Sequence, residues 1–179
     1  MGDSFIVQFI KKWKQVGAIS PSSIFLVEDM LDEVDFQTAK IIVELGAGSG
    51  SFTKEILKKM RKDAVLYVFE IDEVFYRRLS KIRDERMILI KDSAENVSKY
   101  VNRNSDYIIS GIPLSNLNDR VKEGIISGAV ENLRFGGIFL QFQYLPESLS
   151  LLRTFFGSVK MRFTFLNTPP AFFYICRKV

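Results

Sequence analysis

The sequence contains no histidine and a single cysteine, Cys176, among its 179 residues. These two counts exclude a Ser-His-Asp or Cys-His hydrolase, a metal site with histidine ligands and a cysteine zinc site. We therefore predict that the protein holds no metal. A disulfide within the chain is also excluded, and the lone thiol fits a reducing compartment.

Long apolar segments are absent as well. The longest uncharged stretch, residues 163–176, has 14 residues and is interrupted by Pro169 and Pro170. A membrane-spanning helix needs about 20 apolar residues. Lys11 and Lys12 interrupt the N-terminal apolar run where a signal peptide would continue it. We expect a cytoplasmic protein that can still touch the inner face of a membrane as a peripheral protein.

The composition is that of one folded domain, with 47% hydrophobic and 26% charged residues. Lys and Arg outnumber Asp and Glu by 25 to 21, which gives a net charge of +4. The excess is concentrated in residues 101–179, with 9 basic and 5 acidic side chains and no acid after Glu147. This basic, aromatic-rich end indicates an anionic partner such as membrane lipid or nucleic acid. A slightly basic soluble domain without such a partner is the alternative.

Short apolar runs alternate with helical segments along most of the chain. The pattern predicts helices at 5–16, 22–31, 52–60, 73–82, 94–100, 119–132 and 147–155, and strands at 41–45, 65–69, 87–90, 107–110, 138–143, 159–166 and 172–177. Repeated strand–helix units are typical of a mainly parallel sheet with helices on both faces, an α/β fold. The joint at 167–170 is too short for a parallel crossover, so the last two strands should be antiparallel.

Residues 1–35 are expected to form N-terminal helices, and residues 36–179 the core of a single domain. In the first helix, Phe5, Phe9 and Trp13 recur at helical spacing, with lysines elsewhere on the wheel. This stripe either dips into a bilayer while the lysines meet anionic head groups, or packs on the protein's own sheet.

The strongest chemical signal is a glycine-rich turn between the first strand and the next helix. It reads Glu44-Leu45-Gly46-Ala47-Gly48-Ser49-Gly50, and glycines there let the backbone approach a bound cofactor closely. Glu70 ends the following strand, where an acid can accept both hydroxyls of a ribose. Dinucleotide sites have the spacing Gly-x-Gly-x-x-Gly, which would require a glycine at position 51. This chain has Ser51 there.

At this point the chain resembles the class I S-adenosylmethionine-dependent methyltransferases, whose first motif is acid-x-Gly-x-Gly-x-Gly. The resemblance implies a Rossmann-like, seven-stranded sheet whose last strand is antiparallel. It places Gly46–Gly50, with Ala47 and Ser49, under the methionine and ribose of S-adenosyl-L-methionine, and Glu70 on the ribose. Ile71 would lie beside the adenine, and Asp92, followed by Ser93 and Ala94, would meet its amino group. Two alternatives stay open: Asp92 as a helix N-cap, and Glu44 as a residue that only orients the loop.

Three further stretches, residues 16–23, 109–115 and 141–146, look like those of the small bacterial phospholipid N-methyltransferases. These enzymes methylate phosphatidylethanolamine stepwise and are similar to the ribosomal RNA adenine dimethylases. The likeness runs over essentially the whole chain. It implies that the stretch before the glycine motif forms a cap over the methionine end of the cofactor, with four residues at the cofactor: Ile19, Ser20, Pro21 and Ser22. It also favours membrane contact for the helix at 5–16.

The resemblance also favours a lipid over RNA as the substrate. The RNA enzymes carry Asn-Leu-Pro-Tyr after strand four, where this chain has Ser110-Gly111-Ile112-Pro113-Leu114. The aromatic residue that stacks on a flipped adenine is therefore missing, which argues against a nucleobase. We expect a phospholipid amine as substrate, with an RNA adenine N6-methyltransferase or a small-molecule amine methyltransferase as the alternatives.

Methyl transfer from a sulfonium needs alignment and dehydration more than acid–base catalysis, so the absence of histidine is tolerable. The main chain at Ser110 and Gly111 is expected to hold the amine, with Ser110 also beside the cofactor. Gln143 and Tyr144 are candidates for orienting the amine or its phosphate, and Tyr144 is a further catalytic candidate. Tyr144 as a packed aromatic is the alternative.

Overall fold

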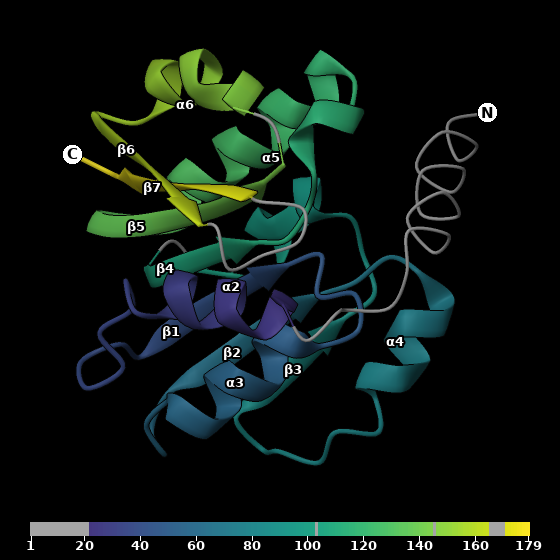
Figure 1. The fold of residues 1–179 in the computed structure, drawn as a ribbon. Coiled ribbons are helices and arrows are strands. Elements are labelled where there is room, and N and C mark those ends of the chain that lie inside the picture. The colour runs from purple at the N-terminus through teal and green to yellow at the C-terminus, as the bar shows by residue number, and fades with distance from the viewer. Residues whose placement is uncertain (1–21, 103, 145, 165–170) are drawn as a thin grey trace.

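The structure is a computed structural model that describes residues 22–102, 104–144, 146–164 and 171–179. Its sheet has seven strands in the order β3-β2-β1-β4-β5-β7-β6 (Figure 1). The strands are β1 (Ile41–Leu45), β2 (Val65–Phe69), β3 (Met87–Ile90), β4 (Ser105–Ser110), β5 (Leu133–Gln143), β6 (Ser158–Thr164) and β7 (Ala171–Arg177). β1 to β5 pair in parallel, and β7 is antiparallel to both β5 and β6. The predicted α/β fold and antiparallel final pair are confirmed.

Helices cover both faces of the sheet (Figure 1). The helical elements are α2 (Ser22–Leu31), α3 (Ser51–Lys59), α4 (Glu73–Leu79), η1 (Ala94–Lys99), η2 (Leu114–Asn116), α5 (Asp119–Asn132), η3 (Pro146–Ser148) and α6 (Leu149–Phe155), where η marks a 3-10 helix. One apolar core joins α2 and α3 to the sheet, and the other joins η1, α5 and α6 to the opposite face. Alternate residues of each strand feed these two cores because side chains in a strand point to opposite faces.

The short helix predicted at 94–100 is present as a 3-10 helix. Three predicted elements need correction. The helix predicted at 147–155 divides into η3 and α6. The helix at 73–82 ends earlier, at Leu79. β5 begins at Leu133 and not at 138, because the two glycines lie inside the strand: Gly136 adopts a φ of 75° and donates its N–H to the carbonyl of Lys178 at 2.8 Å.

The parallel topology brings the ends of β1, β2, β4 and β5 to one edge of the sheet. β1 lies between β2 and β4, with Leu45 beside both Phe69 and Ser110 in register. Ser110 is in turn beside Gln141 of β5. In sheets of this kind, ligands bind outside the carboxyl ends of the strands, where the strand order reverses.

Candidate active site

The glycine-rich turn after β1 adopts backbone angles that favour glycine. Gly46, Gly48 and Gly50 have φ values of 71°, 54° and 82°. The N–H groups of Gly46 and Ala47 both donate to the carbonyl of Phe69 at the end of β2, at 2.9 and 3.2 Å. These two hydrogen bonds therefore hold the glycine turn on the end of β2.

Close packing explains why the first of these positions is glycine. A Cβ on Gly46 would lie 2.5 Å from Cγ1 of Ile112, in the loop after β4. In the opposite direction, a Cβ on Gly111 would lie 3.0 Å from the Gly46 carbonyl oxygen. The loops that follow β1 and β4 are thus in close contact. This contact holds the glycine turn next to Gly111, where the sequence predicts methyl transfer.

The acid at the end of β2 lies directly on the glycine turn. The Glu70 carboxylate accepts from the N–H of Gly48 at 2.6 Å and from the N–H of Asp72 at 2.7 Å. Its side chain is 5% exposed, and burial raises its pKa above the ordinary value. The structure therefore brings together the two features that predict a ribose site, and no atom of the described residues lies within 4 Å of the Cβ position of Gly48.

Apolar and polar side chains surround the position expected for an adenine. Ile71 is 44% exposed next to Glu70, an apolar surface that a flat ring would cover. Asp92 accepts from Asn96 Nδ2 at 2.8 Å and from the Tyr100 hydroxyl at 2.9 Å. The Asn96 bond is the main cause that lowers the Asp92 pKa, so this carboxylate is held in its charged form.

The alternative role for Asp92 as the N-cap is wrong. The N-cap of η1 is Ser93, whose hydroxyl accepts from the N–H of Glu95, and Ala94 is buried behind it. Tyr100, which packs edge-on against Phe69 and bonds Asp92, was missed by the sequence reasoning. No local sequence pattern predicts a role for Tyr100. Its hydroxyl reaches Asp92 only because η1 turns the chain back toward the end of β3.

Glu44 lies behind the loop, in the buried interior. The Thr53 hydroxyl, from α3, donates to Glu44 Oε2 at 2.6 Å, while Oε1 has no hydrogen-bond partner among the described residues. Burial raises the pKa of Glu44 to about 7. Glu44 therefore links β1 to α3 beneath the glycine turn, an arrangement that fits the loop-orienting alternative.

The loop after β4 is held by backbone and by β5. Ser110 is fully buried, and its hydroxyl accepts from the N–H of Ile112 at 3.3 Å. Gly111 donates its N–H to the carbonyl of Leu45 at 3.0 Å. Gln141 Nε2 donates to the carbonyl of Ile112 at 2.8 Å, a contact that the sequence reasoning missed. Ser110 is buried as a whole, main chain included, whereas Gly111 and Ile112 are partly exposed.

The two predicted substrate residues at the end of β5 have different surroundings. Gln143 is 1% exposed and donates from Nε2 to the Ser148 hydroxyl at 2.8 Å. Tyr144 is 41% exposed, and its ring packs edge-on against Phe142 with centroids 4.9 Å apart. Gln143 thus supports the η3 segment from inside, and only Tyr144 presents its side chain to the surface.

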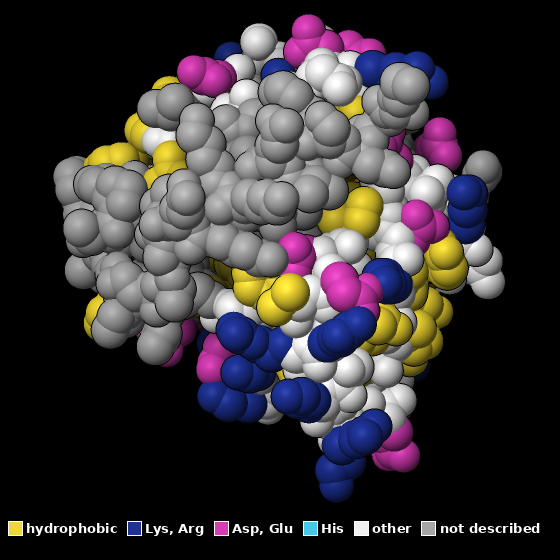
Figure 2. All heavy atoms as spheres, turned by 90° about the vertical axis from the view of Figure 1, so that its right-hand side faces the viewer, with side chains coloured by type: hydrophobic (Ala, Val, Ile, Leu, Met, Phe, Trp, Pro, Cys, Tyr) yellow, Lys and Arg dark blue, Asp and Glu magenta, His cyan; other side chains and the backbone are white. Residues whose placement is uncertain are grey.

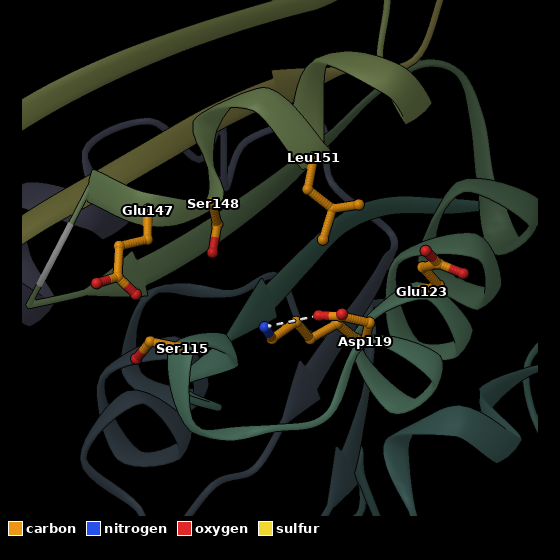
Figure 3. A pocket seen from close by; sticks show the side chains of 7 residues that line it. Ser115, Asp119, Glu123, Glu147, Ser148 and Leu151 are labelled. Atoms are coloured by element: carbon orange, nitrogen blue, oxygen red, sulfur yellow. Dashed lines mark hydrogen bonds and ion pairs between the residues drawn. The ribbon is translucent and has the colours of Figure 1, made fainter.

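A pocket of about 230 Å³ opens beside this end of β5 (Figure 3). Its lining comes from η2, the start of α5, η3 and α6: Ser115, Asp119, Lys122, Glu123, Glu147, Ser148 and Leu151. Lys122 Nζ lies 3.2 Å from Asp119 Oδ1. None of these seven residues was among the sequence candidates.

Several predictions fall outside the residues that the structure describes. These are the helix at 5–16 and the cofactor contacts of Ile19, Ser20 and Pro21. Ser22 is the first residue of α2. Within the described part of the chain, no helix is both long and apolar enough to span a bilayer.

The fold, the glycine turn and the acid that ends β2 define a class I S-adenosylmethionine-dependent methyltransferase. The chain belongs to the ribosomal RNA adenine dimethylase family, whose model matches residues 22–136. The predicted class, fold and cofactor are therefore confirmed.

Comparison with individual proteins gives the same class. The chain is 27% identical to an ornithine lipid N-methyltransferase from Singulisphaera acidiphila over 98% of its length and 95% of that protein. A 16S rRNA methyltransferase from Thermus thermophilus, solved with AdoMet and guanosine, has a TM-score of 0.68 at 18% identity, covering 91% of this chain and 44% of that one. The 1,6-didemethyltoxoflavin N1-methyltransferase from Burkholderia thailandensis has a TM-score of 0.75 at 13% identity, covering 97% and 85%.

Proposed function

We propose that this methyltransferase N-methylates the amine of a membrane lipid head group, with phosphatidylethanolamine or its partly methylated forms as the first choice. One observation carries the proposal: the similarity to the ornithine lipid enzyme spans nearly the full length of both chains. Ornithine lipid and phosphatidylethanolamine both offer an amine at a membrane surface. The shared chemistry is N-methylation of a lipid amine.

S-adenosylmethionine supplies an activated methyl group, so the chain itself contributes mainly position. Glu70 and the turn around Gly48 would hold the ribose, and Asp92 the adenine. The close packing of Gly111 on Gly46 supports a role for the loop after β4 next to the reacting methyl group, because that loop touches the glycine turn that would hold the cofactor. The main chain of Gly111, which is partly exposed while Ser110 is buried, would orient the amine after the amine has lost a proton to water.

Surface charge supports contact with an anionic membrane. On the side of the molecule where α4 lies, Lys and Arg side chains gather below the residues drawn in grey (Figure 2). On and just after α4, exposed basic residues include Arg77, Arg78, Lys81 and Arg83. Basic side chains near an anionic bilayer each contribute about 1 kcal/mol to binding.

RNA adenine methylation is the second candidate, because the family that the chain belongs to is described by that activity. The loop after β4 favours the lipid. Leu114 stands where the RNA enzymes are expected to carry the stacking aromatic, and its side chain is fully buried. An aliphatic side chain in the core cannot stack on a base that has been turned out of a helix.

A competition assay separates the two candidates. The protein is incubated with S-adenosylmethionine labelled in its methyl group, together with phosphatidylethanolamine-containing liposomes and ribosomal RNA in one reaction. The proposal predicts label in the lipid fraction, and the Glu70→Ala variant controls for contaminating activity. Label in RNA alone, together with RNA binding that falls steeply with salt, would replace the lipid by the RNA candidate.

A further inference from the structure

The Asp92 carboxylate collects three hydrogen-bond donors from the segment that follows β3. Its Oδ1 accepts from the Ser93 N–H at 2.7 Å and from Asn96 Nδ2 at 2.8 Å, and its Oδ2 accepts from the Tyr100 hydroxyl at 2.9 Å. A carboxylate has about four acceptor positions, two on each oxygen. The described residues therefore fill both positions of Oδ1 and one of Oδ2, and one position is left on the oxygen that Tyr100 bonds.

This remaining position can only accept a hydrogen bond. The donors, with the Asn96 amide first among them, lower the pKa of Asp92, so the carboxylate is ionised at neutral pH and has no proton to donate. Asp92 is also partly exposed, as a residue that meets a ligand must be. An amino group on a ligand matches such a position, whereas a carbonyl oxygen or a C–H group does not.

The side chain of Tyr100 is held at both of its ends although it is 43% exposed. Its ring packs edge-on against Phe69, the buried last residue of β2, with centroids 5.7 Å apart. Its hydroxyl bonds Asp92, which lies two residues beyond the end of β3. Tyr100 thus joins the ends of the two strands that carry the predicted ribose and adenine ligands, Glu70 and Asp92.

A purely structural role and a role in recognition have different consequences. If the three bonds to Asp92 only closed the turn before η1, loss of the Tyr100 hydroxyl would weaken the binding of every cofactor analogue alike. If the hydroxyl orients the carboxylate for a ligand, the loss is confined to ligands that carry an amino group, because only these use the remaining acceptor position.

We propose that Tyr100 is a positioning residue for cofactor recognition: its hydroxyl fixes the rotation of the Asp92 carboxylate, so that the remaining position of Oδ2 accepts from the amino group of adenine. Asn96 holds the second carboxylate oxygen in the same way. The inference rests on the placement of adenine at Asp92 that the proposed function includes, and it does not depend on the lipid substrate.

The test compares two ligands by calorimetry on the full chain: S-adenosylhomocysteine and its 6-deamino analogue, which has hydrogen in place of the amino group. We expect the wild-type protein to bind the amino ligand about 30-fold more tightly, the equivalent of one hydrogen bond to a charged group. Tyr100→Phe keeps the ring on Phe69 and removes only the hydroxyl. It should reduce the preference to about fivefold by raising the Kd of S-adenosylhomocysteine alone.

Tyr107→Phe is the matched control. The Tyr107 hydroxyl accepts from the N–H of Asp35 near the start of β4, so this variant loses a comparable hydrogen bond without touching Asp92. The control should keep the wild-type preference between the two ligands. A Tyr100→Phe protein that binds both ligands more weakly by the same factor, or that keeps the full preference, would overturn the positioning role.

Asp92→Asn separates that failure from a failure of the adenine site. Because it removes the charge from the acceptor, we expect it to reduce the preference to about threefold or less. If Asp92→Asn keeps the wild-type preference, adenine does not lie at Asp92, and the placement fails together with the inference. If Asp92→Asn loses the preference while Tyr100→Phe keeps it, adenine lies at Asp92 and only the role of Tyr100 is wrong.

Discussion

The two halves of the site are built in different ways. On the cofactor side, the residues expected to make the contacts are the backbone of Gly46 and Gly48 and the buried acid Glu70, which follow β1 and β2 directly. On the side expected to meet the substrate, the pocket acids stand on α5 and η3, and Gln143 bonds Ser148 of η3 from inside. A turn fixed by backbone tolerates little change, whereas the acids on α5 and η3 are side chains that substitution can exchange.

The largest effect is expected where backbone is packed most tightly. Gly46→Ala places a Cβ 2.5 Å from Ile112 at a φ of 71°. We therefore expect the variant to lose about 2 to 5 kcal/mol of stability. We also expect it to lose cofactor binding. Gly48→Ala is the matched control, because it has a positive φ but open space around its Cβ. Urea unfolding measures both. Equal losses in the two variants would show that packing against Ile112 is unimportant.

The next effect concerns the buried acid below the turn. In the folded protein the pKa of Glu44 is about 7, compared with 4.5 for an ordinary glutamate side chain. Unfolding therefore releases this proton, and the stability that Glu44 contributes is full below pH 4.5 and falls as the pH rises to about 7. Glu44→Gln should remove this fall and be more stable than wild type at pH 8 by on the order of 3 kcal/mol.

Urea unfolding of both proteins from pH 5 to pH 8 checks this prediction. Glu73→Gln is the control, because hydrogen bonds from Lys91 and Arg77 lower the pKa of Glu73 and move its titration below this range. Wild-type and Glu44→Gln curves that run parallel from pH 5 to 8 would exclude a raised pKa at Glu44.

A smaller effect is expected from the acid on the turn. Glu70→Ala removes a charged acceptor for the N–H groups of Gly48 and Asp72 and the predicted ribose ligand. We expect the Kd for S-adenosylmethionine to rise about 30-fold, the equivalent of one charged hydrogen bond. Calorimetry measures the Kd, with Glu73→Gln as a nearby surface control. Unchanged affinity would remove Glu70 from the cofactor site.

The smallest effect should appear on the substrate side alone. Gln143→Leu removes the bond to Ser148 and should raise the KM for lipid about fivefold, while the Kd for S-adenosylmethionine stays the same. Tyr144→Phe keeps the ring on Phe142 and removes only the hydroxyl. If Tyr144→Phe has the larger effect in steady-state assays, the exposed tyrosine rather than Gln143 organises the substrate side.

The sequence predicts that the glycine turn and Glu70 meet, as the structure has them, for a physical reason. Gly46, Gly48 and Glu70 follow parallel strands directly, and parallel strands bring their carboxyl ends to one edge whatever the helices do. The predicted start of β5 was wrong around Gly136. The positive φ of Gly136 is accommodated inside β5 by backbone hydrogen bonds to the C-terminal end of the chain. That accommodation depends on residues more than 40 positions away, which a local pattern does not contain.

The substrate side could not be predicted in the same way. Asp119 and Glu123 lie one turn apart on α5, a spacing typical of any exposed helix face. They line a pocket only because η3 and α6 return over α5 with Glu147 and Ser148. Gln143 ends β5 where the sequence predicts a strand end, but its burial depends on that same packing.

The most direct test of lipid N-methylation is mass spectrometry of the lipid product. Purified protein is incubated with S-adenosylmethionine carrying a deuterated methyl group and with liposomes of phosphatidylethanolamine, and head groups are then fragmented. We predict deuterated methyl groups on the head-group nitrogen, absent in the Glu70→Ala variant. Unmodified lipid, in a reaction where added ribosomal RNA or a small amine gains the deuterated methyl, would contradict the account.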